Sequence, residues 1–130
     1  MKQEIDNLIE LICLEDPRYH EDAYDFILEA LSFSQKKYRR AKHVTGKQML
    51  EGVKELVMKR FGPMGRSVLK YWGINGTEDV GHIVFNLIKK KVLTKSEEDC
   101  LEDFKDVYDF ERVFEHIYRK RLDKKISRMR

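Results

Sequence analysis

Three consecutive apolar stripes with helical spacing constrain the fold of this chain more than any other feature of its sequence. Within each stripe the apolar side chains recur at intervals of three and four residues, which is typical of an amphipathic helix packed on a core. The three predicted helices cover residues 45–61, 64–72 and 77–91. Thr45 and Gln48 have the spacing of a capping box at the start of the first helix, and Gly62 followed by Pro63 is expected to end it.

The segment that follows these helices predicts a short β-hairpin. Val92–Thr94 is interpreted as one strand, and the alternation of apolar and polar residues from Phe104 to Phe110 predicts the returning strand. Thr77 is expected to be the N-cap of the helix before the hairpin. Three helices followed by a hairpin have the element order of a winged-helix module, so the second half of the chain is predicted to be winged-helix-like.

The charges of this second half argue against DNA binding. A helix that reads DNA points its N-terminal residues toward the bases, and here Glu78 and Asp79 would occupy that position. The hairpin would add the carboxylates of Glu97, Glu98, Asp99, Glu102, Asp103, Asp106 and Asp109. Because neutralisation of phosphate charge dominates nucleic-acid affinity, specific DNA binding is not expected, and a protein partner is the preferred interpretation.

Further helices are predicted on both sides of this region. Apolar residues at positions 5–13 repeat with helical spacing, and Pro17 is expected to end this first helix because it lacks an amide donor. A longer helix is expected from about His20 to Arg40, and a last one begins near Phe110. The predicted fold is therefore mainly α, with five to six helices and one small β-hairpin.

Composition fits a single globular domain with a basic tail. The chain has 130 residues, of which 42% are hydrophobic and 38% are charged, so a core can form without disulfides or metals. Residues 1–118 are interpreted as the domain and residues 119–130 as the tail. The tail holds seven Lys or Arg and one Asp, so the rest of the chain is net negative although the whole carries +3.

Two basic segments leave open an RNA- or ribosome-associated function. One spans residues 36–47, and the other is the tail. Basic segments attract polyanions, but helix C-termini and solubilising ends have a similar composition. The candidate nucleic-acid contacts are Lys36, Lys37, Arg39, Arg40, Lys42, Arg119, Lys120, Arg121, Lys124 and Lys125.

The stretch from Asp16 to Asp25 supports a third interpretation, a metal-dependent or acid–base enzyme. His20 lies between its carboxylates, but neither an HExxH motif nor a second nearby histidine accompanies it. Acids at a helix start are also explained by the helix dipole. No nucleophile elbow or phosphate-binding loop occurs, so no catalytic residue, metal ligand or cofactor is assigned.

The leading prediction is a non-enzymatic protein-interaction module with an unidentified protein partner. Aromatic and Arg side chains are enriched at interfaces, and Tyr71 is expected to be exposed beside a buried Trp72. An acidic hairpin would suit a basic partner. The candidate contacts are Arg18, Tyr19, Tyr24, Tyr71, Asp103, Asp106 and Asp109.

Cysteine usage and hydropathy predict a cytoplasmic protein. Cys13 and Cys100 form no ligand pair, and reduced thiols are the simplest account of them. Met1–Glu10 contains three acids and no apolar signal core. No apolar run approaches the roughly 18 residues of a membrane span, so no membrane association is expected.

Short motifs spread over about residues 16–110 carry a family resemblance. They are Asp16-Pro17-Arg18-Tyr19, His43-Val44-Thr45-Gly46, Trp72-Gly73-Ile74, Thr77-Glu78-Asp79 with Ile83-Val84-Phe85-Asn86-Leu87-Ile88, and Asp103-Phe104-x-Asp106-Val107-Tyr108-Asp109-Phe110. Together they resemble a family of small bacterial proteins whose activity is not established. The resemblance implies no catalytic residue, and the basic tail lies outside it.

Overall fold

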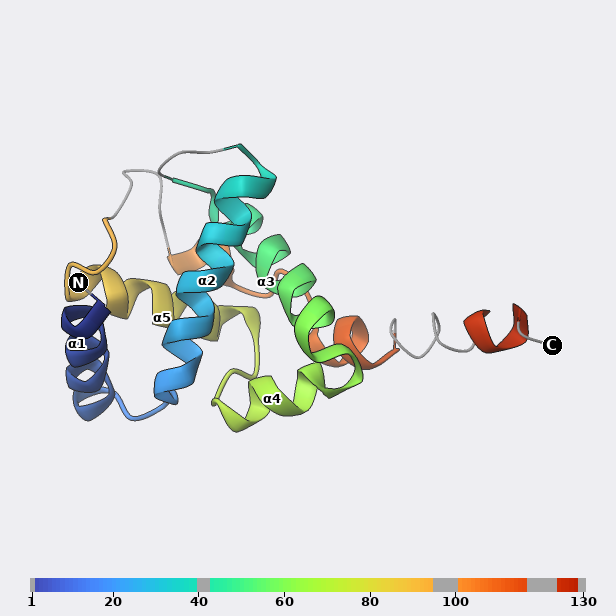
Figure 1. Cartoon of the computed structure of the whole chain (residues 1–130), viewed down its shortest axis with the longest axis horizontal. Coiled ribbons are helices and arrows are strands. Elements are labelled where there is room, and N and C mark those ends of the chain that lie inside the picture. The colour runs from blue at the N-terminus through green and yellow to red at the C-terminus, as the bar shows by residue number, and fades with distance from the viewer. Residues whose placement is uncertain (1, 40–42, 95–100, 117–123, 129–130) are drawn as a thin grey trace.

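The computed structural model describes residues 2–39, 43–94, 101–116 and 124–128. Five α-helices form the domain within these residues. They are α1 (Lys2–Glu15), α2 (Glu21–Lys37), α3 (Gly46–Phe61), α4 (Gly65–Tyr71) and α5 (Thr77–Lys89), joined by the short helical turns η1 (Gly62–Met64), η2 (Leu101–Phe104) and η3 (Glu111–His116). Figure 1 shows α2 and α3 side by side, with α1 at one end, α5 running from α1 behind α2, and α4 below. The prediction of a mainly α single domain is confirmed.

The core lies where α2, α3 and α5 meet. Its fully buried side chains come from the apolar stripes of these helices, with further contributions from α1, α4 and the segment around η3. The largest are Tyr24, Ile27, Leu50, Val53, Val57, Leu69, Ile74, Val80, Ile83, Leu87 and Phe114. The helical periodicity of residues 45–61 and 77–91 therefore identified the buried faces correctly.

A glycine lets α2 and α3 approach closely. A Cβ placed on Gly52 would lie 1.8 Å from Ser34 Oγ and 3.4 Å from the carbonyl oxygen of Ala30. Ser34 is itself fully buried, and its hydroxyl donates a hydrogen bond to the Gln48 carbonyl at 3.4 Å. The crossing of α2 over α3 thus depends on the absence of a side chain at position 52.

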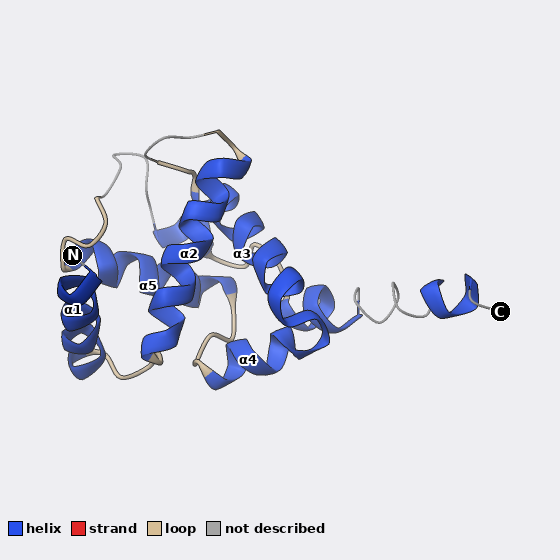
Figure 2. Ribbon diagram, viewed as in Figure 1, coloured by secondary structure: helices blue, strands red, loops and turns tan. Residues whose placement is uncertain are grey.

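The β-hairpin predicted for residues 92–110 is wrong, because the described residues contain no strand (Figure 2). The amides of Val92 and Leu93 both donate to the Leu87 carbonyl, where they close the C-terminus of α5. Lys91 adopts a left-handed φ of 62°, which is typical of a helix C-terminus. These amides are therefore used by the helix end and cannot pair with a neighbouring strand.

Residues 101–110 fold as a turn and not as the returning strand. η2 directs Phe104 into the space between α3 and α5, where Gly46 and Gly81 make room for its ring. Asp106 then has a φ of 48°, and the Val107 amide donates to Thr77 Oγ1 at 3.1 Å. Without a hairpin there is no wing, so the winged-helix prediction is also wrong.

The predicted start of α3 agrees with the structure, whereas the end of α2 and the N-cap of α5 differ from the prediction. Thr45 caps α3, with its Oγ1 accepting from the Gln48 amide and the Gln48 side chain accepting from the Thr45 amide. α2 is shorter than predicted, because it ends at Lys37 and Arg39 has a φ of 53°. The N-cap of α5 is Gly76 and not Thr77, whose side chain is buried under Val107.

Aromatic rings close the end of the core near α4. Tyr108, Phe110 and Phe114 contact one another with ring centroids 5.4–6.3 Å apart, and the Tyr108 hydroxyl donates to the Leu50 carbonyl at 2.7 Å. Residues 124–128 are helical and exposed. The predicted domain boundary at residue 118 lies outside the described residues, and none of the described helices is long and apolar enough to cross a membrane.

Candidate functional site

A polar network joins the loop between α1 and α2 to one face of α5. Asp16 accepts from Arg18 through both carboxylate oxygens, at 2.8 Å from Nε and 2.6 Å from Nη2. The Asn86 side chain donates to Asp16 Oδ2 at 2.9 Å and lies 3.0 Å from the Tyr24 hydroxyl. The Arg18 guanidinium and these hydrogen bonds hold the pKa of the Asp16 carboxyl well below its usual range.

The second part of this network connects Tyr19 to α5. Its hydroxyl donates to Asp79 Oδ1 at 2.5 Å and lies 3.1 Å from His82 Nδ1. The same His82 Nδ1 lies 3.5 Å from Arg18 Nη1, so this nitrogen donates to Tyr19 in one tautomer and accepts from Arg18 in the other. Burial and the Asp79 hydrogen bond raise the pKa of Tyr19 well above its usual range.

Asp79 also completes the capping of α5. Its Oδ2 accepts from the amides of Asn75 at 2.8 Å and Gly76 at 3.1 Å, which have no partner within the helix. Both carboxylate oxygens are therefore used. The network fastens the loop of residues 16–20 to the start and middle of α5, so its first role is structural.

The exposed surface beside this network is formed by the same loop and by α4. Tyr71 at the end of α4 is 75% exposed, and Met64 just before that helix is 59% exposed. The Tyr71 ring lies 5.6 Å from the His20 ring. Arg18 has a 54% exposed side chain and sits 5.2 Å above the Tyr19 ring. We call Arg18, His20, Met64 and Tyr71 the α4 face.

Close backbone packing holds the two parts of the α4 face together. The His20 amide donates to the Trp72 carbonyl at 3.1 Å. Gly73 has a φ of 90°, and a Cβ there would lie 2.2 Å from the Arg18 carbonyl oxygen. Trp72, predicted to be buried, is half-buried and contacts Phe26 and Phe61 at 5.3 and 5.7 Å between ring centroids.

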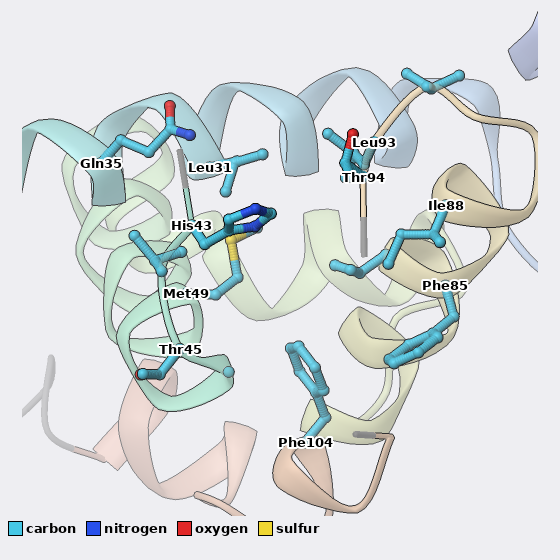
Figure 3. A pocket seen from close by; sticks show the side chains of 14 residues that line it. Leu31, Gln35, His43, Thr45, Met49, Phe85, Ile88, Leu93, Thr94 and Phe104 are labelled. Carbon is cyan, nitrogen blue, oxygen red and sulfur yellow. The ribbon is translucent and has the colours of Figure 1, made fainter. Parts of the chain in front are cut away.

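An apolar pocket of about 460 Å³ opens between α2, α3, α5 and η2. Figure 3 shows side chains from all these elements around it, with Leu31 from α2, Met49 from α3 and Phe85 from α5. Phe104 forms another wall. The full lining is Leu31, Gln35, His43, Val44, Thr45, Gly46, Met49, Val84, Phe85, Ile88, Val92, Leu93, Thr94 and Phe104. None of these side chains is a carboxylate, an ammonium or a guanidinium.

The structure separates the predicted protein contacts into two groups. Tyr24 is completely buried and Tyr19 is 3% exposed, so neither offers a surface to a partner. Tyr71, Arg18, Asp103, Asp106 and Asp109 are exposed. Asp106 and Asp109 line a polar groove of about 490 Å³ that also contains Arg66, Glu78 and Glu111.

The cluster expected between Asp16 and Asp25 does not converge on a pocket. His20 is the N-cap of α2 and accepts from the Asp22 amide at 3.1 Å, whereas Asp16 faces Arg18 and Asn86. Asp25 is exposed on α2. Within the described residues, no group of three or more His, Cys, Asp or Glu side chains could hold a metal ion.

The structure describes some of the candidate nucleic-acid contacts of each basic segment, and these residues are exposed. Lys36, Arg39, Lys124 and Lys125 are exposed, and Lys37 pairs with Glu55 of α3. Gly46 lies within the basic segment 36–47 and packs against Asp103 and Phe104 of the acidic region. Arg40, Lys42, Arg119, Lys120 and Arg121 lie outside the described residues, as does Cys100.

The spacing of three polar residues in the sequence could have predicted part of the polar network. Asp79, His82 and Asn86 are spaced three and four residues apart, which places them on one face of α5 beside its apolar stripe. The sequence indicated the apolar pocket less clearly, through Phe85, which does not belong to the apolar stripe of α5. Its other walls come from segments that are distant in sequence, so only the tertiary structure reveals it.

Comparisons with known proteins find no match. No family model, no curated protein and no solved structure matches this chain. The resemblance to a family of small bacterial proteins therefore stays a prediction, and the functional interpretation depends on the geometry described above.

Proposed function

We propose that the protein is a non-enzymatic interaction module that binds a protein partner through the α4 face. The observation that carries this proposal is the exposure of Tyr71 on a surface whose backbone is held in place. A tyrosine that is 75% exposed beside the His20 ring presents a large amphipathic ring to a partner. Tyr and Arg dominate the energetic centres of protein interfaces for this reason.

Neighbouring side chains extend this surface in a way that suits a protein. Met64 precedes α4 and Tyr71 ends it, so an exposed apolar side chain stands at each end of this short helix. Arg18 adds a guanidinium that Asp16 already orients. An apolar centre with a polar and charged edge is the usual composition of a protein interface.

The preorganised backbone lowers the expected cost of binding. Gly73 and the His20–Trp72 hydrogen bond fasten the loop to α4, and the polar network fastens it to α5. A backbone held in this way need not be ordered when the partner arrives. The face can therefore bind without a large conformational change.

Site-specific photo-crosslinking tests this proposal on the full-length chain. A benzophenone amino acid replaces Tyr71, and the protein is irradiated in native lysate with and without nuclease. We expect one discrete protein adduct that survives nuclease. Excess unlabelled wild-type protein should compete for it, but the Met64→Ala, Tyr71→Ala double variant should compete at least tenfold less well.

The same photo-crosslinker at Lys47 provides the matched control. Lys47 is also exposed but lies at the start of α3, on a different element from the α4 face. Identical adducts from both positions, or equal competition by the wild-type and double-variant proteins, would contradict the proposal.

A second candidate function is RNA binding through the tail. It is favoured by the exposure of Lys124, Lys125 and Arg128 on one short helical segment. Lys37 pairs with Glu55 of α3, so part of the charge of the basic segment 36–47 is offset by an acidic neighbour. This interaction would therefore depend mainly on the tail, and an adduct lost on nuclease treatment would support it over the α4 face.

A further inference from the structure

We infer that the apolar pocket between α2, α3, α5 and η2 binds a compact, uncharged, mainly apolar small molecule. This site is separate from the α4 face and does not depend on the proposed protein interaction. Its cavity of about 460 Å³ falls within the range of about 300–1,000 Å³ that is typical of small-molecule sites.

The lining of the pocket determines the charge of the ligand. Charged residues make up 38% of the chain, yet none of the fourteen lining residues is Asp, Glu, Lys or Arg. An ion that entered would lose its hydration without meeting an opposite charge, which is strongly unfavourable. A neutral molecule avoids this penalty, so the pocket selects for the absence of charge.

The walls determine the shape and the chemistry of the ligand body. Phe104 and Phe85 provide aromatic surfaces, and Met49 adds a polarizable thioether. Thioether and aromatic groups pack well against aromatic ligands. Phe104 is buried, and a Cβ on Gly81 would lie 2.8 Å from its side chain, so this wall occupies space that the absence of a side chain at Gly81 leaves open.

The polar side chains of the pocket are Gln35, which is half-buried, and His43, Thr45 and Thr94, which are exposed. Met49 and Phe104, by contrast, are buried. This arrangement suits a ligand with one hydrogen-bonding group directed toward solvent and an apolar body inside. An aromatic alcohol of two fused rings has this chemistry and is a suitable probe.

The position of Phe85 supports a binding role for this surface. Phe85 does not belong to the α5 stripe of Val80, Ile83 and Leu87, which are all buried in the core. It lines the pocket together with Val84 and Ile88. Val84 and Phe85 also pack against the core, so the apolar surface of α5 continues from the core into the pocket.

Displacement of a neutral fluorescent probe tests this inference. The full-length protein is titrated with N-phenyl-1-naphthylamine, and the bound probe is displaced by 2-naphthol, 2-naphthoate or naphthylmethylammonium. These three competitors share a ring system and differ in charge. We expect saturable binding of the probe, and displacement by 2-naphthol at concentrations at least tenfold lower than those needed for either ion.

Two pocket variants and one control locate the binding site. Thr94→Trp adds bulk at the exposed edge, and Val84→Phe adds bulk to a half-buried wall, so at least one should fold. Each folded variant, judged by urea unfolding, should weaken probe binding at least tenfold. Ser67→Trp on α4 adds the same bulk at an exposed position outside the lining and should leave binding unchanged.

Several outcomes would overturn this inference. They are the absence of saturable probe binding below about 1 mM, equal displacement by the neutral and charged naphthalenes, and unchanged binding by folded Thr94→Trp and Val84→Phe proteins. Displacement by an apolar helical peptide but not by 2-naphthol would also overturn it, and would assign the pocket to a protein segment.

Discussion

Asp16 shows how one side chain can connect three segments of this molecule. It follows α1, pairs with Arg18 in the next loop and accepts a hydrogen bond from Asn86 of α5. Asn86 also contacts the Tyr24 hydroxyl, whose pKa is raised to about 12, chiefly by burial. The polar ends of buried tyrosines are thus satisfied by residues that also fasten the loop.

Replacement of Asp16 by Asn should make stability less sensitive to acid. The folded protein holds the pKa of Asp16 below its unfolded value of about 3.9, so the ionised form stabilises the fold above that pH. This contribution is lost as the pH falls through the lower folded value. At pH 7 we expect Asp16→Asn to reduce the free energy of unfolding by about 1–2 kcal/mol, because Arg18 is partly screened by solvent.

Urea unfolding at pH 7, 4 and 2.5 measures this effect. The difference between wild-type and variant proteins should shrink as the pH falls below about 4, because Asp16 then gains a proton in the unfolded chain while the folded protein keeps it ionised. A difference that stays constant over the whole range would mean that the carboxylate charge contributes nothing.

At the scale of helices, the α2–α3 crossing depends on a position without a side chain. Helix propensity alone would favour alanine over Gly52 by about 1 kcal/mol. The buried hydroxyl of Ser34 occupies the space that this methyl group would need. Packing therefore outweighs propensity at this position.

The Gly52→Ala variant should be less stable than the wild type by about 1–3 kcal/mol, the usual cost of overpacking a core. Ser34→Ala removes the closest atom, so the cost of Gly52→Ala should be smaller by about 1 kcal/mol or more in that background. A double-mutant cycle of thermal or urea unfolding measures this coupling. Additive effects, or a stabilising Gly52→Ala, would contradict the close crossing.

At the scale of the whole molecule, the charges are distributed unevenly. The tail at residues 119–130 is strongly basic, whereas the rest of the chain is net negative. Any RNA binding should therefore be weak, indifferent to sequence and strongly dependent on salt, because it depends on counterion release by the tail.

Deletion of residues 119–130 should abolish this RNA binding and leave the fold unchanged. The aromatic packing of Phe110 and Phe114 is complete before the deleted residues begin. Filter binding of full-length and truncated proteins in rising salt measures the first effect, and circular dichroism measures the second. Sequence-selective binding that survives both truncation and high salt would instead require an RNA-binding surface on the domain.

The sequence by itself determined the helices, because their signals are local. The apolar stripes of α3 and α5, the capping box at Thr45 and the stop at Gly62-Pro63 each act within a few residues. The exposure of Tyr71 could be predicted for the same reason. One face of α5, with Asp79, His82 and Asn86, was also readable from its spacing.

Only the tertiary structure decided the region after α5 and the two candidate sites. Phe104, Tyr108 and Phe110 alternate with polar residues as a strand would, yet they pack on different elements. The alternating pattern predicts which residues are buried, but it does not predict which elements cover them. The pocket and the α4 face likewise join residues that are distant in sequence, and their chemistry arises from contacts that no local pattern specifies.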